Sequence, residues 1–325
     1  MKTLCELLNI DVPILQGGMG NGSNAPLTAA ISNAGGLGTI GVGTRSPQEI
    51  EALILETKAL TNKPFAVNVP LTVASSIKEI MALIVSHSIP IVSLSAGNPA
   101  PFIPKLKAHG IVVICVVASV YHAKKAEEAG ADVIVAEGYE AAGLNSPLET
   151  TTMTLVPQVT SAVSVPVVAA GGVADGRGLA ASMMLGAQGV QIGTRFIAVQ
   201  ESPFHAVYKE ALLEASDQDT VVVGRSVGRI RRVMKAPYAQ TLLHYEKEGV
   251  TLEQFNELTT ETHHLKGAMD GNLQEGFINS GQIAGLITSI PTARELMTTM
   301  MDEASYAIEQ SFQTFHSFKN KEESC

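Results

Sequence analysis

The sequence has few cysteines, no excess of positive charge and no long hydrophobic run. Its three cysteines, Cys5, Cys115 and Cys325, are odd in number and far apart, so they indicate neither a disulfide framework nor a CxxC metal site. The formal net charge of -9 argues against nucleic acid as a partner, because binding to a polyanion needs a basic surface. A small molecule is the expected ligand, and no metal is expected.

Signals for insertion into a membrane or for secretion are also missing. No apolar stretch reaches the roughly 18 to 20 residues that span a bilayer. The first residues include one early lysine, but Glu6 and Asp11 interrupt the apolar run, which is unlike a secretory signal. We therefore expect a cytoplasmic protein that does not contact a membrane.

What the sequence does contain is an alternation of short Val- and Ile-rich runs with longer amphipathic stretches. Apolar runs alternating with helical patterns predict a parallel sheet covered by helices. Eight such units in roughly 200 residues predict a (β/α)8 TIM barrel, since an open doubly wound sheet usually has fewer strands. The eight runs are Val12 to Gln16, Leu37 to Gly41, Pro64 to Val69, Ile91 to Ala96, Ile111 to Val117, Asp132 to Glu137, Val165 to Ala170 and Gly189 to Ile192.

The alternation stops after Phe196. Residues 204–280 have the pattern of helices joined by polar loops, which predicts an inserted helical cap over the C-terminal face of the barrel. A final helix from about Pro291 to Gln310 is expected to pack back on the barrel. The predicted organisation is thus a barrel formed by residues 1–203 and 281–325, with the cap between them.

Glycines mark the ends of the seventh and eighth predicted strands. The first loop contains Ala170, Gly171 and Gly172, and the second begins at Gly193 and Thr194. In TIM barrels these two loops commonly hold a phosphate, and small residues there expose main-chain N–H groups to the anion. Thr194 adds a hydroxyl donor. The alternative is that the glycines only form tight turns, but two such loops together favour a phosphate site.

Two other strand ends carry candidate binding residues. The first predicted strand runs into Gly18, Met19 and Gly20, where glycines would let a planar group lie against the main chain and Met19 could pack on a ring. A turn with a core methionine is the alternative there. The third strand places Asn68 within an apolar run, and a buried amide needs hydrogen-bond partners that a heterocycle would supply.

Several segments, in unchanged order from about residue 10 to 290, resemble the nitronate monooxygenase family, formerly called 2-nitropropane dioxygenases. That family includes FMN-dependent enoyl-ACP reductases and an NADH:quinone reductase. The segments are PILQGGM at 13 to 19, GGLGTIG at 35 to 41, AEGYEAAG at 136 to 143, TTMTLVPQV at 151 to 159, VPVVAAGGVADGRG at 165 to 178, LGAQGVQIGTRF at 185 to 196 and SGQIAGL at 280 to 286.

The resemblance implies a non-covalently bound FMN. Four groups of residues would then contact the cofactor: some border the flavin ring, one lies at its polar edge, some hold the phosphate, and one approaches from the cap. The flavin ring would be bordered by Gly18, Met19, Gly20, Ala142 and Gly143, with Asn68 at its polar edge. The phosphate would be held by Ala170, Gly171, Gly172, Gly193 and Thr194. The residue that approaches from the cap would be Gln282.

The chain departs from the family pattern after the sixth strand. There the resemblance implies a histidine that acts as catalytic acid or base, but this chain has Leu144, which cannot transfer a proton. Two titratable residues are candidate replacements. His122 follows the fifth strand, although a helix-start histidine is often a solvated or capping residue, and Glu137 ends the sixth strand. Glu137 and Glu140 have a structural alternative as hydrogen-bond acceptors.

Basic residues cluster between Arg225 and Lys235 in this acidic chain. The cluster would suit the phosphates of NADH or NADPH, or the acidic surface of an acyl carrier protein, whereas the alternative is a set of surface ion pairs. His263 and His264 are adjacent, so they would point to different faces of a helix and make a poor metal pair.

Three functions follow from these observations. The first is oxidation of an anionic nitronate by FMN and O2, which needs no base because the substrate arrives deprotonated. The second is an NAD(P)H-dependent FMN reductase of the enoyl-ACP or quinone reductase type, with acyl carrier protein a partner only in this case. The third is a flavin-binding sensor or storage protein without enzymatic activity. A homodimer is one expected assembly.

Overall fold

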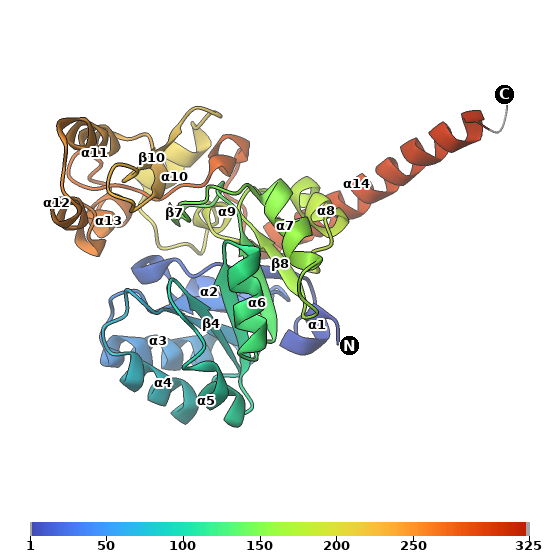
Figure 1. The fold of residues 1–325 in the computed structure, drawn as a ribbon, viewed down its shortest axis with the longest axis horizontal. Coiled ribbons are helices and arrows are strands. Elements are labelled where there is room, and N and C mark those ends of the chain that lie inside the picture. The colour runs from blue at the N-terminus through green and yellow to red at the C-terminus, as the bar shows by residue number, and fades with distance from the viewer. Residues whose placement is uncertain (1, 323–325) are drawn as a thin grey trace.

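A computed structural model describes residues 2–322, and Figure 1 shows its ribbon. Eight parallel strands form one sheet in the order β1-β9-β8-β6-β5-β4-β3-β2, and a bridge between Leu15 and Leu37 joins the first strand to the last. The sheet is therefore closed, and the predicted TIM barrel is confirmed. Its strands are β1 (Ile14–Gln16), β2 (Gly38–Gly41), β3 (Phe65–Pro70), β4 (Ile91–Ser95), β5 (Val112–Val117), β6 (Val133–Glu137), β8 (Val167–Ala170) and β9 (Gly189–Ile192).

Both faces of these strands are largely buried, which explains why their sequences are mostly apolar. Successive residues alternate between two clusters: Val133 and Val135 belong to one cluster and Ile134 to the other. The first of these clusters also contains Leu4 and Leu8 of α1 (Leu4–Leu8). The N-terminal helix thus packs on the same core as one face of the sheet.

Helices follow most strands and cover the outer face of the barrel. Two of them begin at residues that match known capping rules: Ser46 caps α3 in a capping box with Glu49, and Asp175 caps α8 by accepting from two main-chain N–H groups. These helices are α2 (Ala25–Asn33), α3 (Pro47–Leu60), α4 (Ile77–Ser86), α5 (Ile103–Ala108), α6 (Val120–Glu128), α7 (Thr152–Thr160), α8 (Gly176–Met184) and the short α9 (Thr194–Ile197).

The segment from residue 204 to 280 is not purely helical, so the prediction of a helical cap was wrong in this respect. It contains the antiparallel strands β10 (Thr220–Val223) and β11 (Arg231–Met234), and β11 also pairs with β7 (Gly143–Leu144) from the loop after β6. The β-branched run at 220–223 explains β10, whereas Val233 is the single β-branched residue of β11. The helices of the segment are α10 (Ala206–Leu213), α11 (Pro237–Glu248), α12 (Leu252–Leu258) and α13 (Glu261–Ala268).

The final helix, α14 (Ala293–Glu322), is longer than predicted. Its first part packs on α8 and α2 and buries Met297 and Met300, as expected. Its later part projects from the body of the molecule, and Phe312 and Phe315 are each 70% exposed (Figure 1). Among residues 2–322, no helix is both long enough and apolar enough to cross a membrane.

Candidate functional site

The loops that follow β1, β6, β8 and β9 meet at the carboxyl ends of the strands. Gly17 N–H donates to the Ile192 carbonyl at 2.9 Å, and Gly138 N–H donates to the Ala170 carbonyl at 2.8 Å. These contacts place the four loops around one opening, which we call the mouth of the barrel. The mouth is where TIM-barrel enzymes carry their active sites.

The loop after β8 has the main-chain conformation that its glycines predict. Gly171 and Gly172 have φ values of 87° and 76°, in the left-handed region that other residues rarely adopt. A Cβ on Gly171 would lie 2.9 Å from the Gly138 carbonyl oxygen, so this glycine is also required by packing on the loop after β6. A Cβ on Gly193, at the end of β9, would meet nothing within 4 Å. Space is therefore open beside Gly193.

The hydroxyl of Thr194 accepts a hydrogen bond from Gly281 N–H at 2.9 Å, and the threonine is buried. This leaves the hydroxyl proton for an acceptor in the mouth. Gln282, which follows Gly281, donates its main-chain N–H to the Glu140 carbonyl at 3.0 Å, while its side chain is exposed. Segment 280–282 thus closes the space between the loops after β6 and β9, beside Ala142.

Asn68 lies directly beside Gly18, whose Cβ would be only 2.2 Å from the Asn68 Oδ1 atom. The prediction that a heterocycle supplies the partners of this buried amide was wrong for its nitrogen: Nδ2 donates to the Ser93 and Ser95 hydroxyls, each at 3.2 Å. Among the described residues no donor reaches Oδ1. This oxygen remains available at the place where the resemblance puts the polar edge of a flavin.

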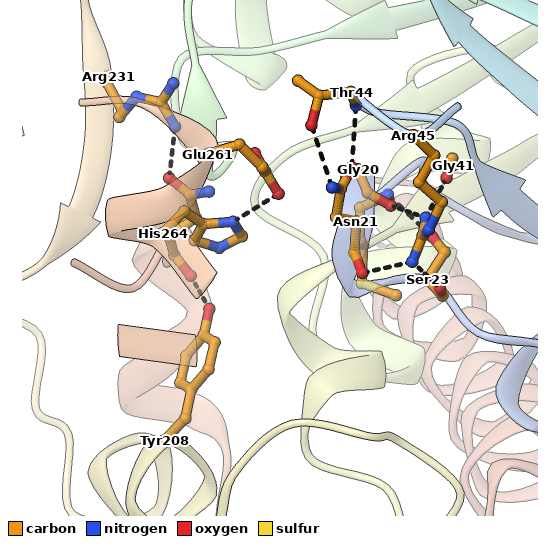
Figure 2. A network of polar contacts seen from close by, with 12 residues as sticks. Gly20, Asn21, Ser23, Gly41, Thr44, Arg45, Tyr208, Arg231, Glu261 and His264 are labelled. Atoms are coloured by element: carbon orange, nitrogen blue, oxygen red, sulfur yellow. Dashed lines mark hydrogen bonds and ion pairs between the residues drawn. The ribbon is translucent and has the colours of Figure 1, made fainter. Parts of the chain in front are cut away.

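The loop after β1 is held by Arg45, which the sequence analysis did not single out. Its guanidinium donates to four carbonyl oxygens, those of Gly20, Asn21, Ser23 and Gly41, at 2.5 to 3.1 Å (Figure 2). Met19 packs beside both the barrel core and the core of the inserted segment. Arg45 therefore fixes the position of the predicted ring-binding residues without facing the ring itself.

Leu144 lies directly opposite Arg231 in the register of β7 and β11. The guanidinium of Arg231 packs over the ring of Phe277, with 4.9 Å from Cζ to the ring centroid, and donates to the Asn279 Oδ1 atom at 3.2 Å. A Cβ on Gly143 would lie 3.8 Å from that amide. The position of the missing histidine is thus occupied by an apolar side chain beside a fixed positive charge.

The two candidate proton-transfer residues differ in their surroundings. His122 is exposed at the start of α6, and its Nδ1 contacts the Ser119 hydroxyl at 2.9 Å, as in a helix cap. Glu137 ends β6 opposite Ala170, and burial raises its pKa to about 7. Glu140 is a structural hydrogen-bond acceptor, because its carboxylate receives the Thr152 N–H and hydroxyl, each at 2.9 Å.

The basic cluster does not form one patch. Arg225 pairs with Glu149 at 2.8 Å, and Arg232 is buried against the Tyr139 ring at 4.6 Å. Arg229 is exposed, whereas Arg231 is half-buried and lies opposite Leu144 in the strand register. The histidines of α13 are separated as expected: His263 stacks on Tyr238 and His264 on Phe277. Within residues 2–322, no three metal-ligating side chains come together, and Cys325 lies outside the described residues.

Comparison with known proteins agrees with this geometry. The family model for nitronate monooxygenase matches residues 1–80 and 72–303. The chain belongs to the nitronate monooxygenase family. One relative, the (3aS,4S,5R,7aS)-5-hydroxy-7a-methyl-1-oxo-octahydro-1H-indene-4-carboxyl-CoA dehydrogenase of Rhodococcus jostii, is 34% identical over 93% of this chain and 95% of its own length. A probable nitronate monooxygenase of Staphylococcus saprophyticus is also 34% identical, over 86% and 91% of the two chains.

A solved structure, FabK from Thermotoga maritima, is similar over 97% of this chain and 99% of that one, with 40% identity and a TM-score of 0.92. The protein is therefore an oxidoreductase of this flavin-dependent family. The residues of the mouth fit a flavin. Open space beside Gly193 and the free Thr194 hydroxyl proton suit a phosphate, and the Asn68 Oδ1 atom suits an N–H group of the ring.

Proposed function

We propose that the protein oxidises small anionic nitronates, with FMN as cofactor and O2 as oxidant. The observation that carries the proposal is Leu144 beside Arg231. A nitronate is already deprotonated, so its oxidation does not need the proton-transferring side chain that Leu144 replaces. A guanidinium next to this position stabilises an anion, and similarity to a probable nitronate monooxygenase supports the same function.

In this proposal the glycine-rich loops hold the cofactor, and the inserted segment holds the substrate. Gly171, Gly172, Gly193 and Thr194 would bind the phosphate, and Gly18, Met19 and Gly20 would border the ring. FMN would supply the two-electron chemistry between substrate and O2, which protein side chains do not supply. The protein's own contribution is to orient the nitronate against the ring and to balance its charge.

The test is oxygen consumption with propyl-1-nitronate and with neutral 1-nitropropane. We expect turnover of the nitronate and at least about 10²-fold lower kcat/KM for the neutral form, since general acid–base help is typically worth 10²- to 10⁴-fold. Heat denaturation should release FMN and not FAD. Equal kcat/KM for the two substrate forms would mean that another group, such as Glu137 or His122, serves as a base, and the proposal would then be wrong.

A second candidate is an NAD(P)H-dependent FMN reductase that acts on an enoyl thioester or a quinone. Two similarities favour it: FabK is an enoyl-ACP reductase, and the Rhodococcus relative is named for a CoA thioester substrate. Such an enzyme must protonate carbon, and Glu137 would have to supply that proton. Anaerobic mixing with NADH and with NADPH distinguishes the two: rapid bleaching of the flavin supports the reductase, and an unchanged spectrum supports nitronate oxidation.

A further inference from the structure

We propose that Arg231 and Asn279 form the binding site for the anionic group of the substrate, a planar group of the carboxylate or nitronate type. The inference deepens the function proposed above and rests on it. It adds the residues that select the substrate, which lie in the inserted segment and not in the flavin loops.

Arg231 is held in place from two sides. Its guanidinium lies 4.9 Å from the centroid of the fully buried Phe277 ring, and one nitrogen, Nη1, donates to Asn279 Oδ1 at 3.2 Å. Phe277 is in turn fixed by the stacked His264 ring, with centroids 5.5 Å apart. A guanidinium on an aromatic face keeps a defined plane. Arg231 therefore presents its remaining N–H groups in one orientation.

Those remaining donors have no acceptor within residues 2–322. Among the described residues no hydrogen bond reaches Nε or Nη2 of Arg231, or Nδ2 of Asn279, and Arg231 forms no ion pair. This differs from Arg225 on the same hairpin, whose guanidinium is paired with Glu149. Burial lowers the pKa of Arg231 to about 10, so it stays charged at neutral pH. An unpaired charge with free donors, partly shielded from water, calls for an anion.

The nearby carboxylate does not occupy this site. Glu261 contacts the His264 Nδ1 atom at 3.3 Å and accepts from the Asn21 main-chain N–H. It would lie 3.6 Å from a Cβ on Gly20, so it joins the inserted segment to the loop after β1 (Figure 2). Glu261 thus helps to close the mouth beside Arg231, while its own hydrogen bonds are made elsewhere.

The site lies where a substrate over a flavin would be. Arg231 is opposite Leu144 in the strand register, and the Asn279 amide is 3.8 Å from the position of a Cβ on Gly143. Gly143 is one of the residues expected to border the ring. The fork of a guanidinium matches the two oxygens of a carboxylate or nitronate.

The test is isothermal titration calorimetry of the flavin-loaded protein with benzoate, and with benzamide as its neutral counterpart. We expect benzoate binding that R231M weakens about 10- to 100-fold, the usual worth of hydrogen bonds to a charged group. R231K should fall between R231M and wild type, since it keeps the charge but loses the planar fork. The exposed Arg229 provides the matched control, and R229M should bind benzoate within about twofold of wild type.

The outcomes separate this inference from the proposed function. Benzoate binding that depends on Arg231, in a protein that oxidises no nitronate, would support the site and refute the function. Nitronate turnover with an unchanged KM in R231M would refute the site and leave the function standing. Equal binding of benzoate by R231M and wild type, or tighter binding of inorganic phosphate than of benzoate, would also overturn it. Thermal melting of R231M beside R231K identifies any general loss of folding.

Discussion

The two sides of the barrel mouth carry different kinds of chemical group. On the barrel side the residues proposed to hold the cofactor are mostly glycines, among them Gly18, Gly171 and Gly193, which have only main-chain groups to offer. On the side of the inserted segment they are charged and polar side chains, chiefly Arg231 and Asn279. Main-chain groups can hold the same cofactor whatever the substrate is. In the proposed site the substrate is therefore selected on the opposite side, where substitution changes the ligand that fits.

We expect the largest effect from a substitution on the barrel side of the mouth. Gly193→Val would put a branched side chain into the open space where the phosphate is expected, and we predict flavin content below about a tenth of wild type. The variant should still fold, because its Cβ meets nothing within 4 Å and its φ is negative. It is therefore a cleaner test than Gly171→Val, whose Cβ would press on the Gly138 carbonyl.

Flavin absorbance per protein, measured after purification, checks this prediction. Gly110→Val is the control, at a glycine far from Gly193 in the sequence. A Cβ at Gly110 also meets nothing within 4 Å, although the φ of this residue is +72°. That variant should keep its flavin although it is strained. Full flavin content in Gly193→Val would show that the phosphate lies elsewhere.

A second change tests the position that lies opposite Arg231 in the strand register. Leu144→His restores a proton-transferring group beside Arg231, and we expect kcat/KM for neutral 1-nitropropane to rise about tenfold or more. Turnover of propyl-1-nitronate should change much less, because this substrate has already lost its acidic α-proton. Leu144→Gln, which is polar but cannot act as a base, is the matched control. A similar gain in both variants would assign the effect to polarity and not to proton transfer.

The third prediction concerns Glu137, whose carboxyl lies at the end of a barrel strand. Its pKa is raised by burial from the ordinary 4.5 to about 7, so the folded protein favours the protonated form. Stability from this group is present below pH ~4.5 and is lost as the pH rises through ~7. Glu137→Gln should therefore gain about 1 to 3 kcal/mol in unfolding free energy over wild type at pH 8 and almost nothing at pH 4.5.

Urea denaturation at several pH values measures this difference. The exposed Glu253 is the control position, and Glu253→Gln should show no such pH-dependent gain. A constant difference between Glu137→Gln and wild type from pH 4.5 to 8 would mean that the carboxyl is not protonated in the folded protein.

The smallest expected effect lies outside both sides of the mouth. Removing residues 311–325 should change the unfolding free energy by less than about 1 kcal/mol, because the described side chains from 311 to 318 are exposed. Flavin content and turnover should stay unchanged. Thermal melting of the truncated and full chains checks this, and a large loss of stability would show that Phe312 or Phe315 is buried in solution, for example against a second copy.

The barrel could be predicted because its signals are local. Most strands are largely apolar runs, and Gly171 and Gly172 stand where the chain needs a left-handed conformation. The hairpin of β10 and β11 was missed because its strands have only four residues each and lie among helices. The pairing of Arg231 with Leu144 joins positions far apart in the sequence, and no local pattern reports such a contact. The length of α14 did have a signal, since no glycine or proline follows Pro291.

The direction of α14 has a practical consequence. A helix of 30 residues is roughly 45 Å long at 1.5 Å per residue, and its free end points away from the inserted segment (Figure 1). A surface, an electrode or a fluorescent label attached at this end would stand well clear of the mouth. Immobilised protein should then exchange substrate and O2 as readily as protein in solution, with the helix acting as a built-in spacer.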